Sequence, residues 1–117
     1  MRDDVDESDW KWFRQVRGVA LQRFCDSVLE ETGAIMADTA RSSHERFIAV
    51  YNLIQERNGE LADGFDSPKR SAMLVQLAFL RGHKLLTDDE FFLFRRETCE
   101  TVTALLGGES GDDTVED

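Results

Sequence analysis

Two histidines are the residues of this sequence best suited to bind a metal ion, yet their surroundings predict no metal site. His44 precedes Glu45, but no second histidine follows at the spacing that the zinc-binding motif HExxH requires. Neither His44 nor His83 completes a Glu-x-x-His pair of the kind that holds two irons inside a helical bundle. We therefore expect no metal ion and no bound cofactor.

Two cysteines are the strongest candidates for a nucleophile. Cys25 and Cys99 each lie within an apolar helical pattern and not in a CxxC spacing. Such positions are typical of buried, unreactive thiols, and cysteines used in this way favour a reducing compartment. An enzyme with an inconspicuous site, built from Cys99, His83 or paired carboxylates, stays open as an alternative.

Two pairs of glutamates have the spacing that places both carboxylates on one face of a helix. They are Glu56 with Glu60, and Glu97 with Glu100. Pairs of this kind serve general acid–base catalysis in some enzymes, but they are usual on any solvated helix. Neither of the phosphate-binding loops GxGxxG and GxxxxGK[ST] is present. We therefore predict no catalytic residue and a protein that is not an enzyme.

The first helix expected from the sequence begins near Ser8 or Asp9 and continues past Gly33 to about Ala37. Apolar residues recur along it at spacings of three and four, which predicts one buried face. This face consists of Phe13, Val16, Ala20, Phe24 and Val28.

The second expected helix starts at a capping box formed by Ser42 and Glu45. Gly64 is its predicted end, since glycine adopts the left-handed conformation after a helix at no steric cost. The predicted inner face consists of Phe47, Val50, Tyr51 and Ile54.

The third expected helix begins at Ser67-Pro68 and ends at Gly82, with the serine as cap and the proline at the first helical position.

The fourth expected helix begins at a second capping box, Thr87 with Glu90, and stops at Gly107-Gly108. Its predicted buried side consists of Phe91, Phe94, Thr98, Val102 and Leu105.

Charge is concentrated at the two ends of the chain. Of the net charge of −10, residues 1–9 contribute −4 and residues 109–117 contribute −5, so the stretch between them carries −1. Acidic ends favour solubility and disfavour non-specific binding to nucleic acid. We expect a flexible acidic N-terminus at 1–8, one helical domain at 9–106 and a disordered acidic tail at 107–117. The expected fold is all-α, an antiparallel bundle of about four helices.

The location of the protein is expected to be cytoplasmic. The N-terminus is acidic and lacks the apolar core of a signal peptide, and no run of residues has the length and apolarity of a membrane span.

The most unusual segment opens the first helix, at residues 10–17. Trp10 and Trp12 lie about 200° apart around a helix, so a single buried face does not cover both. Phe92 lies about 100° from Phe91 around a helix, so the face that buries Phe91 does not cover Phe92 either. Aromatic residues and arginines are enriched at protein interfaces, so the sequence predicts a protein-binding surface, most simply that of a homodimer. Its predicted residues are Trp10, Trp12, Arg14, Arg17, Phe92, Arg95 and Arg96.

Residues 68–106 also permit a helix-turn-helix, which leaves a nucleic-acid-associated regulator as an alternative function. The arginines available to phosphates are Arg14, Arg17, Arg95 and Arg96. A recognition helix presents its N-terminal residues to the bases. Here those residues are Asp88, Asp89 and Glu90, which phosphates repel.

The run Leu85-Leu86-Thr87-Asp88-Asp89-Glu90-Phe91 resembles the signature of the short C-terminal (SHOCT) helical hairpin of bacterial proteins. The resemblance covers about residues 72–106, and the glycine that the module has before the two aliphatic residues is Lys84 here. The module is an interaction or oligomerisation element, so the resemblance implies a bacterial protein that binds other proteins. We therefore predict a small, non-enzymatic accessory protein that binds protein and self-associates, with no small-molecule substrate.

Overall fold

The computed structural model describes residues 5–66 and 68–116, and for residues 108–116 it describes the backbone alone. The described residues form five α-helices and one 3-10 turn, without a strand, which confirms the predicted all-α class. The elements are α1 (Glu7–Ala37), α2 (Ser43–Phe65), η1 (Arg70–Ala72), α3 (Met73–Gly82), α4 (Asp88–Phe91) and α5 (Arg96–Glu116).

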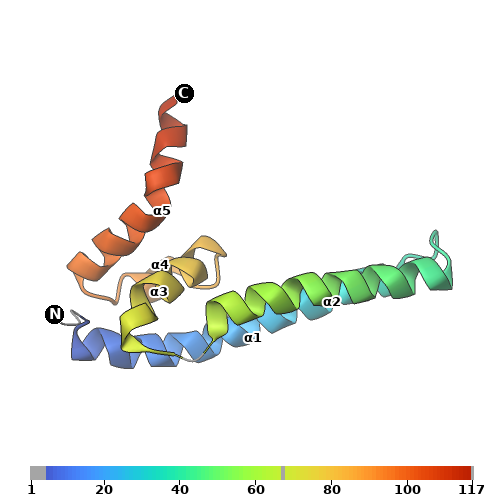
Figure 1. Ribbon diagram of the computed structural model, residues 1–117, viewed down its shortest axis with the longest axis horizontal. Coiled ribbons are helices and arrows are strands. Elements are labelled where there is room, and N and C mark those ends of the chain that lie inside the picture. Colours follow the sequence, from blue (N-terminus) through green and yellow to red (C-terminus); the bar gives the residue numbers. More distant parts are fainter. Residues whose placement is uncertain (1–4, 67, 117) are drawn as a thin grey trace.

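Helices α1 and α2 form a long antiparallel hairpin, and the other elements gather at one end of it (Figure 1). The radius of gyration is 17.3 Å, against about 13 Å for a compact domain of this length. We name residues 25–61 the arm, and residues 5–24 together with 62–107 the body. The chain is therefore a helical body from which a two-helix arm projects.

The hydrophobic core lies in the body, apart from Val28 at the start of the arm. All five members of the apolar face predicted for α1 are buried, at no more than 9% exposed, which confirms that part of the helical periodicity. They pack against side chains of α3, α4 and α5. The most deeply buried of these partners are Met73, Leu77, Leu80, Phe91 and Val102.

The inner face predicted for α2 is wrong in most of its members. Phe47, Tyr51 and Ile54 are 66%, 55% and 43% exposed, and Val50 alone of the four is half-buried. Only Gly64 and Phe65, the last two residues of α2, are buried. The apolar residues of α2 do share one face, but the later elements gather at one end of the hairpin and leave most of this face exposed.

Gly64 does not end α2 in the left-handed conformation, which corrects a second prediction. It lies inside the helix, and a Cβ atom there would come within 2.1 Å of Cε2 of Phe79. Glycine is required at this position because the ring of Phe79 packs directly on the backbone of α2.

The predicted third and fourth helices also have different bounds. Helix α3 begins at Met73, after η1, and not at Pro68, while Ser67 lies outside the described residues. The segment predicted as one helix from Thr87 is divided into α4 and α5, with residues 92–95 between them. Both predicted capping boxes are present, Ser42 with Glu45 and Thr87 with Glu90.

The two ends of the chain differ in part from expectation. Helix α1 begins at Glu7 and is capped by Asp6, one to two residues before the predicted start. The backbone helix α5 continues through Gly107-Gly108 to Glu116, since glycine costs a helix about 1 kcal/mol but does not forbid it. Residues 1–8 were predicted to be flexible, and of these residues 1–4 lie outside the described part of the chain. Residues 107–117 were predicted to be disordered, and the side chains of 108–117 lie outside it as well.

None of the helices in the described part of the chain is both long and apolar enough to cross a membrane.

Candidate interaction surfaces

Both tryptophans of the predicted interface pack against the body. The ring of Trp10 stacks on Phe13 with 5.8 Å between centroids, and the guanidinium of Arg70 lies 5.5 Å from the centroid of the Trp10 ring. The indole nitrogen of Trp12 donates a hydrogen bond to the carbonyl oxygen of Glu90 at 2.9 Å. Trp10 and Trp12 point apart as their spacing requires, and each is half-buried by a different neighbour.

Of the four predicted interface arginines, Arg17 is half-buried and the other three are exposed. Arg17 donates a hydrogen bond to the carbonyl oxygen of Phe65 at 2.6 Å, which ties α1 to the end of α2. Arg95 is anchored by its backbone N–H, which bonds to a buried carboxylate. Arg14 and Arg96 are exposed. The side chain of Arg95 is exposed as well, so Arg17 is the one of the four whose side chain is drawn into the body.

That buried carboxylate belongs to Asp9, which is 2% exposed. Its Oδ1 accepts a hydrogen bond from the backbone N–H of Arg95 at 3.0 Å, and its Oδ2 accepts one from the hydroxyl of Thr98. Because Arg95 immediately precedes α5, a negative charge from α1 occupies the positive end of that helix. The sequence indicated Asp9 only as a possible start of its own helix. Its spacing of four from Phe13, on the buried face, was the available signal.

A second polar link joins α1 to α4 through Arg23 and Glu90. The guanidinium of Arg23 donates to both carboxylate oxygens of Glu90, at 2.7 and 2.9 Å, and also to the carbonyl oxygen of Leu85 at 2.9 Å. The Glu90 carboxylate also accepts the N–H of Thr87 in the capping box. The Arg23 guanidinium is the main cause that lowers the pKa of Glu90 to about 2.

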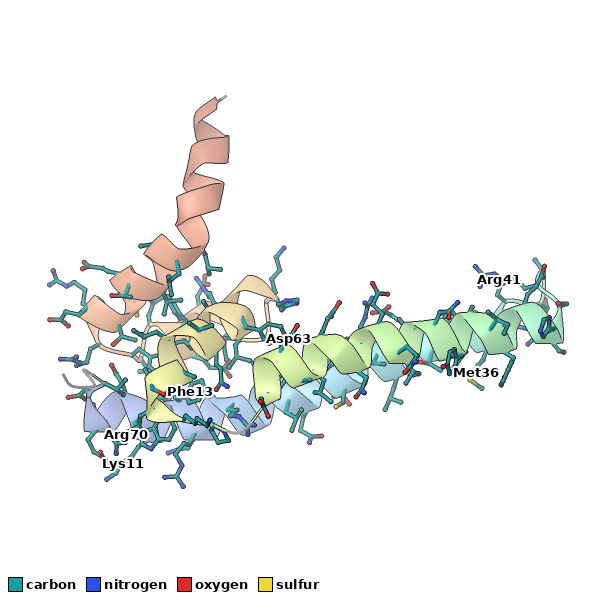
Figure 2. All side chains as sticks on the ribbon, viewed as in Figure 1. Lys11, Phe13, Met36, Arg41, Asp63 and Arg70 are labelled. Carbon is teal, nitrogen blue, oxygen red and sulfur yellow. The ribbon has the colours of Figure 1, made fainter. Side chains whose placement is uncertain are left out.

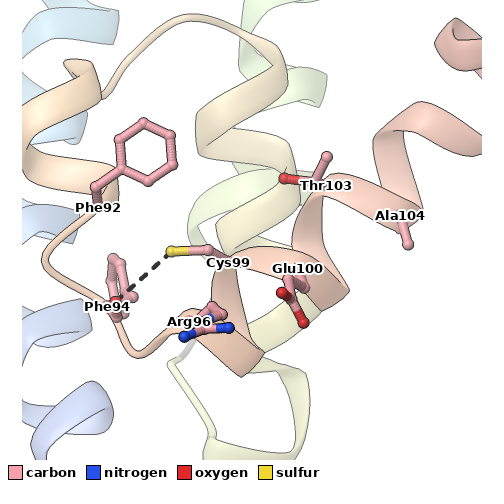
Figure 3. A pocket seen from close by; sticks show the side chains of 7 residues that line it. All are labelled: Phe92, Phe94, Arg96, Cys99, Glu100, Thr103 and Ala104. Atoms are coloured by element: carbon pink, nitrogen blue, oxygen red, sulfur yellow. Dashed lines mark hydrogen bonds between the residues drawn. The ribbon is translucent and has the colours of Figure 1, made fainter.

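A hollow of about 560 Å³ lies beside α5 and is the largest one described (Figure 3). Phe92, 62% exposed, and Arg96 stand at it together with Cys99. The thiol of Cys99 donates toward the carbonyl oxygens of Phe91 and Phe94, with Sγ at 3.4 and 3.6 Å from them. Burial raises the pKa of the Cys99 thiol, so the thiol stays protonated at neutral pH and is a poor nucleophile.

Of the other chemistry-bearing residues, Glu100 lines the same hollow as Cys99, whereas the histidine of the body does not. His83 lines a different hollow and lies against the ring of Phe79, 4.1 Å between centroids. Arg57 draws Glu31, Glu56 and Glu60 around its guanidinium, at 3.0, 3.5 and 3.3 Å. Among the described residues, no three His, Cys, Asp or Glu side chains are grouped closely enough to hold a metal ion.

The arm carries the largest set of exposed apolar side chains. From α1 it exposes Leu29 at 66% and Met36 at 59%. From α2 it exposes three of the four residues of the expected inner face, and Ile48 at 40%. A groove of about 220 Å³ with mostly apolar walls runs between the two helices. Leu29 and Ile54 stand on its sides, and Arg57 is among the residues that line it. The apolar spacing of these α2 residues predicted a buried face, so this surface was not expected from the sequence.

No protein-family model matches the sequence, and neither a curated protein nor a solved structure shows significant similarity to it.

Proposed function

We propose that this chain is a small, non-enzymatic accessory protein that acts by binding protein, and that it self-associates. The observation that carries the proposal is the projecting arm, which exposes five large apolar side chains at 43–66%. Contiguous apolar surface of this size on a soluble domain is typical of a protein-binding site.

The segment that resembles the SHOCT hairpin supports the same function. Leu85 and Leu86 are buried, and Thr87 caps the next helix as the resemblance implies. Lys84 has a φ of 60°, in the left-handed region that favours glycine, and glycine is the residue that the module has at this position. An interaction module of bacterial proteins is consistent with a cytoplasmic accessory role, which we include in the proposal.

Sedimentation equilibrium of the full chain, at low and moderate salt, tests the proposal. We expect a dimer whose dissociation constant changes little with salt, because the exposed side chains are apolar. A chain that stays monomeric at the highest concentration reached would contradict self-association.

The alternatives receive less support from the geometry. A nucleic-acid regulator would need its arginines free for phosphates, whereas Arg17 bonds to a backbone carbonyl and Arg95 lies 3.5 Å from the Asp9 carboxylate. Binding to DNA that falls steeply with salt would favour that alternative over ours. An enzyme would use Cys99, His83 or paired carboxylates. Cys99 and His83 line separate hollows, and burial raises the pKa of the Cys99 thiol, so neither residue activates the other.

A further inference from the structure

One face of the arm is mostly apolar along its length. Nine residues at spacings of three and four define this face, which we name the stripe. They are Cys25, Leu29, Thr32 and Met36 of α1, and Phe47, Tyr51, Ile54, Asn58 and Leu61 of α2. Residues 25–61 hold ten charged side chains, and none falls at these nine positions.

The two halves of the stripe lie level with each other. Leu29 and Ile54 share one groove. Two antiparallel helices advance by the same 1.5 Å per residue in opposite directions, so Thr32 lies level with Tyr51 and Met36 with Phe47. The stripe is therefore one continuous surface made by both helices.

The body does not obstruct the stripe. The turn after α3 lies at a separate hollow, which His83 and Leu85 line together with Ser27, Glu31 and Glu60, none of them a member of the stripe. In Figure 2, the body rises from one side of the hairpin and Met36 lies toward the other. A second molecule can reach the stripe without displacing any part of the chain.

The area of the stripe matches that needed by a small dimer. A fully exposed large side chain presents about 200 Å², so exposures of 43–66% at five positions amount to roughly 550–600 Å² of apolar surface. Two copies facing each other cover roughly twice that, close to the lower limit of about 1,200 Å² for a specific interface. Rim residues add to this figure.

We propose that the stripe is covered by the stripe of a second copy of this chain, so that two arms form an intermolecular four-helix bundle. The inference rests on the proposed self-association and specifies its surface. In a bundle of this kind, apolar residues at spacings of three and four on all four helices face one core. The stripe supplies that pattern on both helices of each copy.

Charge favours arms that run in opposite directions. The part of the arm near the body, residues 25–31 and 56–61, holds five acidic residues and one arginine. The part near the tip, residues 36–47, holds two acidic residues and two arginines. Parallel arms would place the two acidic parts together, whereas antiparallel arms place each beside a neutral tip.

The antiparallel arrangement gives the groove an occupant. A two-fold axis at the level of Thr32 and Tyr51 places Phe47 of the second copy four residues from the axis on the body side, almost level with Ile54. The exposed ring then enters the apolar groove between Leu29 and Ile54. By symmetry, each dimer contains this contact twice.

Sedimentation equilibrium of Phe47→Ala tests the surface, with Ile48→Ala as the matched control. Ile48 is exposed on the same helix but lies in a hollow with Arg41 and Asn52, outside the stripe. For Phe47→Ala we expect the dissociation constant to rise on the order of 100-fold, roughly tenfold for each copy of a central aromatic anchor. For Ile48→Ala we expect a change of less than about threefold. Circular dichroism checks that both variants keep the helical fold.

Cross-linking tests the direction of the arms. In a Cys25→Ser background, Thr32→Cys places one thiol of each copy at the two-fold axis, and mild oxidation should yield a disulfide-linked dimer. Ser27→Cys, on the opposite side of the hairpin, should yield none. Cys99 is buried and does not compete.

Each outcome is decisive. A monomeric wild-type chain overturns both the stripe and the proposed self-association. A wild-type dimer that Phe47→Ala does not weaken overturns the stripe alone and leaves self-association through another surface, such as that of Phe92. Dissociation by Phe47→Ala without cross-linking through Thr32→Cys overturns the antiparallel arrangement.

Discussion

The body and the arm share helix α1 and the same apolar spacing, but they differ in what covers it. In the body, the apolar face of α1 from Phe13 to Phe24 is at most 6% exposed, because α3, α4 and α5 fold onto it. In the arm, residues of the same kind and spacing, such as Leu29 and Phe47, remain 66% exposed. Periodicity thus identifies which face of a helix is apolar. In the body, other helices of this chain bury that face, whereas in the arm no other segment of the described chain does.

The polar contacts of the body also join segments that are distant in the sequence, whereas those of the arm are local. Asp9, Trp12, Arg17 and Arg23 of the body bind groups that lie 48–89 residues away in the sequence. In the arm, the corresponding contacts join neighbouring parts of one hairpin, as when Arg46 donates to the carbonyl oxygen of Met36. The body is therefore stabilised by its own long-range contacts, and the arm depends on one helix pair.

The largest expected difference between the regions comes from removing one phenylalanine from each. Phe13→Ala, at a fully buried position, should lower the free energy of unfolding by about 3–5 kcal/mol through lost burial and a cavity. Phe47→Ala should change it by less than about 0.5 kcal/mol, because its ring is already in water. Urea denaturation at concentrations low enough to keep the chain monomeric measures both. Equal losses would show that the arm is covered within the monomer.

The buried carboxylate of the body should give the next largest effect. Asp9→Ala leaves the N–H of Arg95 and the hydroxyl of Thr98 without their acceptor, at a cost of about 2–3 kcal/mol in unfolding free energy. Asp26→Ala, an exposed acid on the arm part of α1, should cost less than about 0.5 kcal/mol. If Asp9→Ala proved as mild as Asp26→Ala, the charge at the start of α5 would not be a stabilising contact.

Two glycines of α2 should respond to alanine in opposite directions. Gly64→Ala forces the ring of Phe79 to move and should destabilise the chain by about 1–3 kcal/mol. Gly59→Ala, in the arm with no other atom within 4 Å of a new Cβ, should stabilise it by about 0.5–1 kcal/mol through better helix propensity. Thermal unfolding of the two variants compares them directly, and a gain in both would contradict the close approach of α3 to α2.

The smallest expected effect depends on pH and concerns Glu90. Its pKa is lowered from the ordinary 4.5 to about 2, so the charged form stabilises the body at and above pH 4.5 and this contribution is lost as pH falls toward 2. Glu90→Gln should cost about 1 kcal/mol at pH 7 and flatten the loss of stability between pH 4.5 and 2. Glu30→Gln on the exposed arm should leave that slope unchanged. Urea denaturation at several pH values measures it, and an unchanged slope in Glu90→Gln would contradict the role of the Arg23 pair.

Local signals in the sequence predicted much of the fold. The capping boxes at Ser42 and Thr87 formed as expected, because each requires only four consecutive residues. The break between α4 and α5 was not predictable in this way, since the start of α5 is bonded to Asp9, 86 residues earlier in the chain. The end of α2 was misplaced for a similar reason, because Gly64 serves the ring of Phe79 and not a turn.

The predicted interface residues illustrate a different limit. The sequence indicated correctly that Trp10 and Trp12 cannot share one buried face, but it could not show that η1 and α4 would half-cover them. It also could not show that Arg17 would bond to a carbonyl oxygen of α2. Whether an apolar or charged side chain stays free for a partner depends on which distant segments of the chain pack against it. Composition and spacing do not contain that information.

The continuity of α1 has a mechanical consequence. This single helix of 31 residues, about 46 Å long at 1.5 Å per residue, is embedded in the body at one end and forms half of the arm at the other (Figure 1). No loop interrupts it, so it fixes the distance between the body and the tip of the arm. In the antiparallel dimer that we propose, the two arms overlap in one four-helix bundle, and the two bodies lie at its opposite ends. Any two molecules bound by those bodies would then be kept at a defined separation.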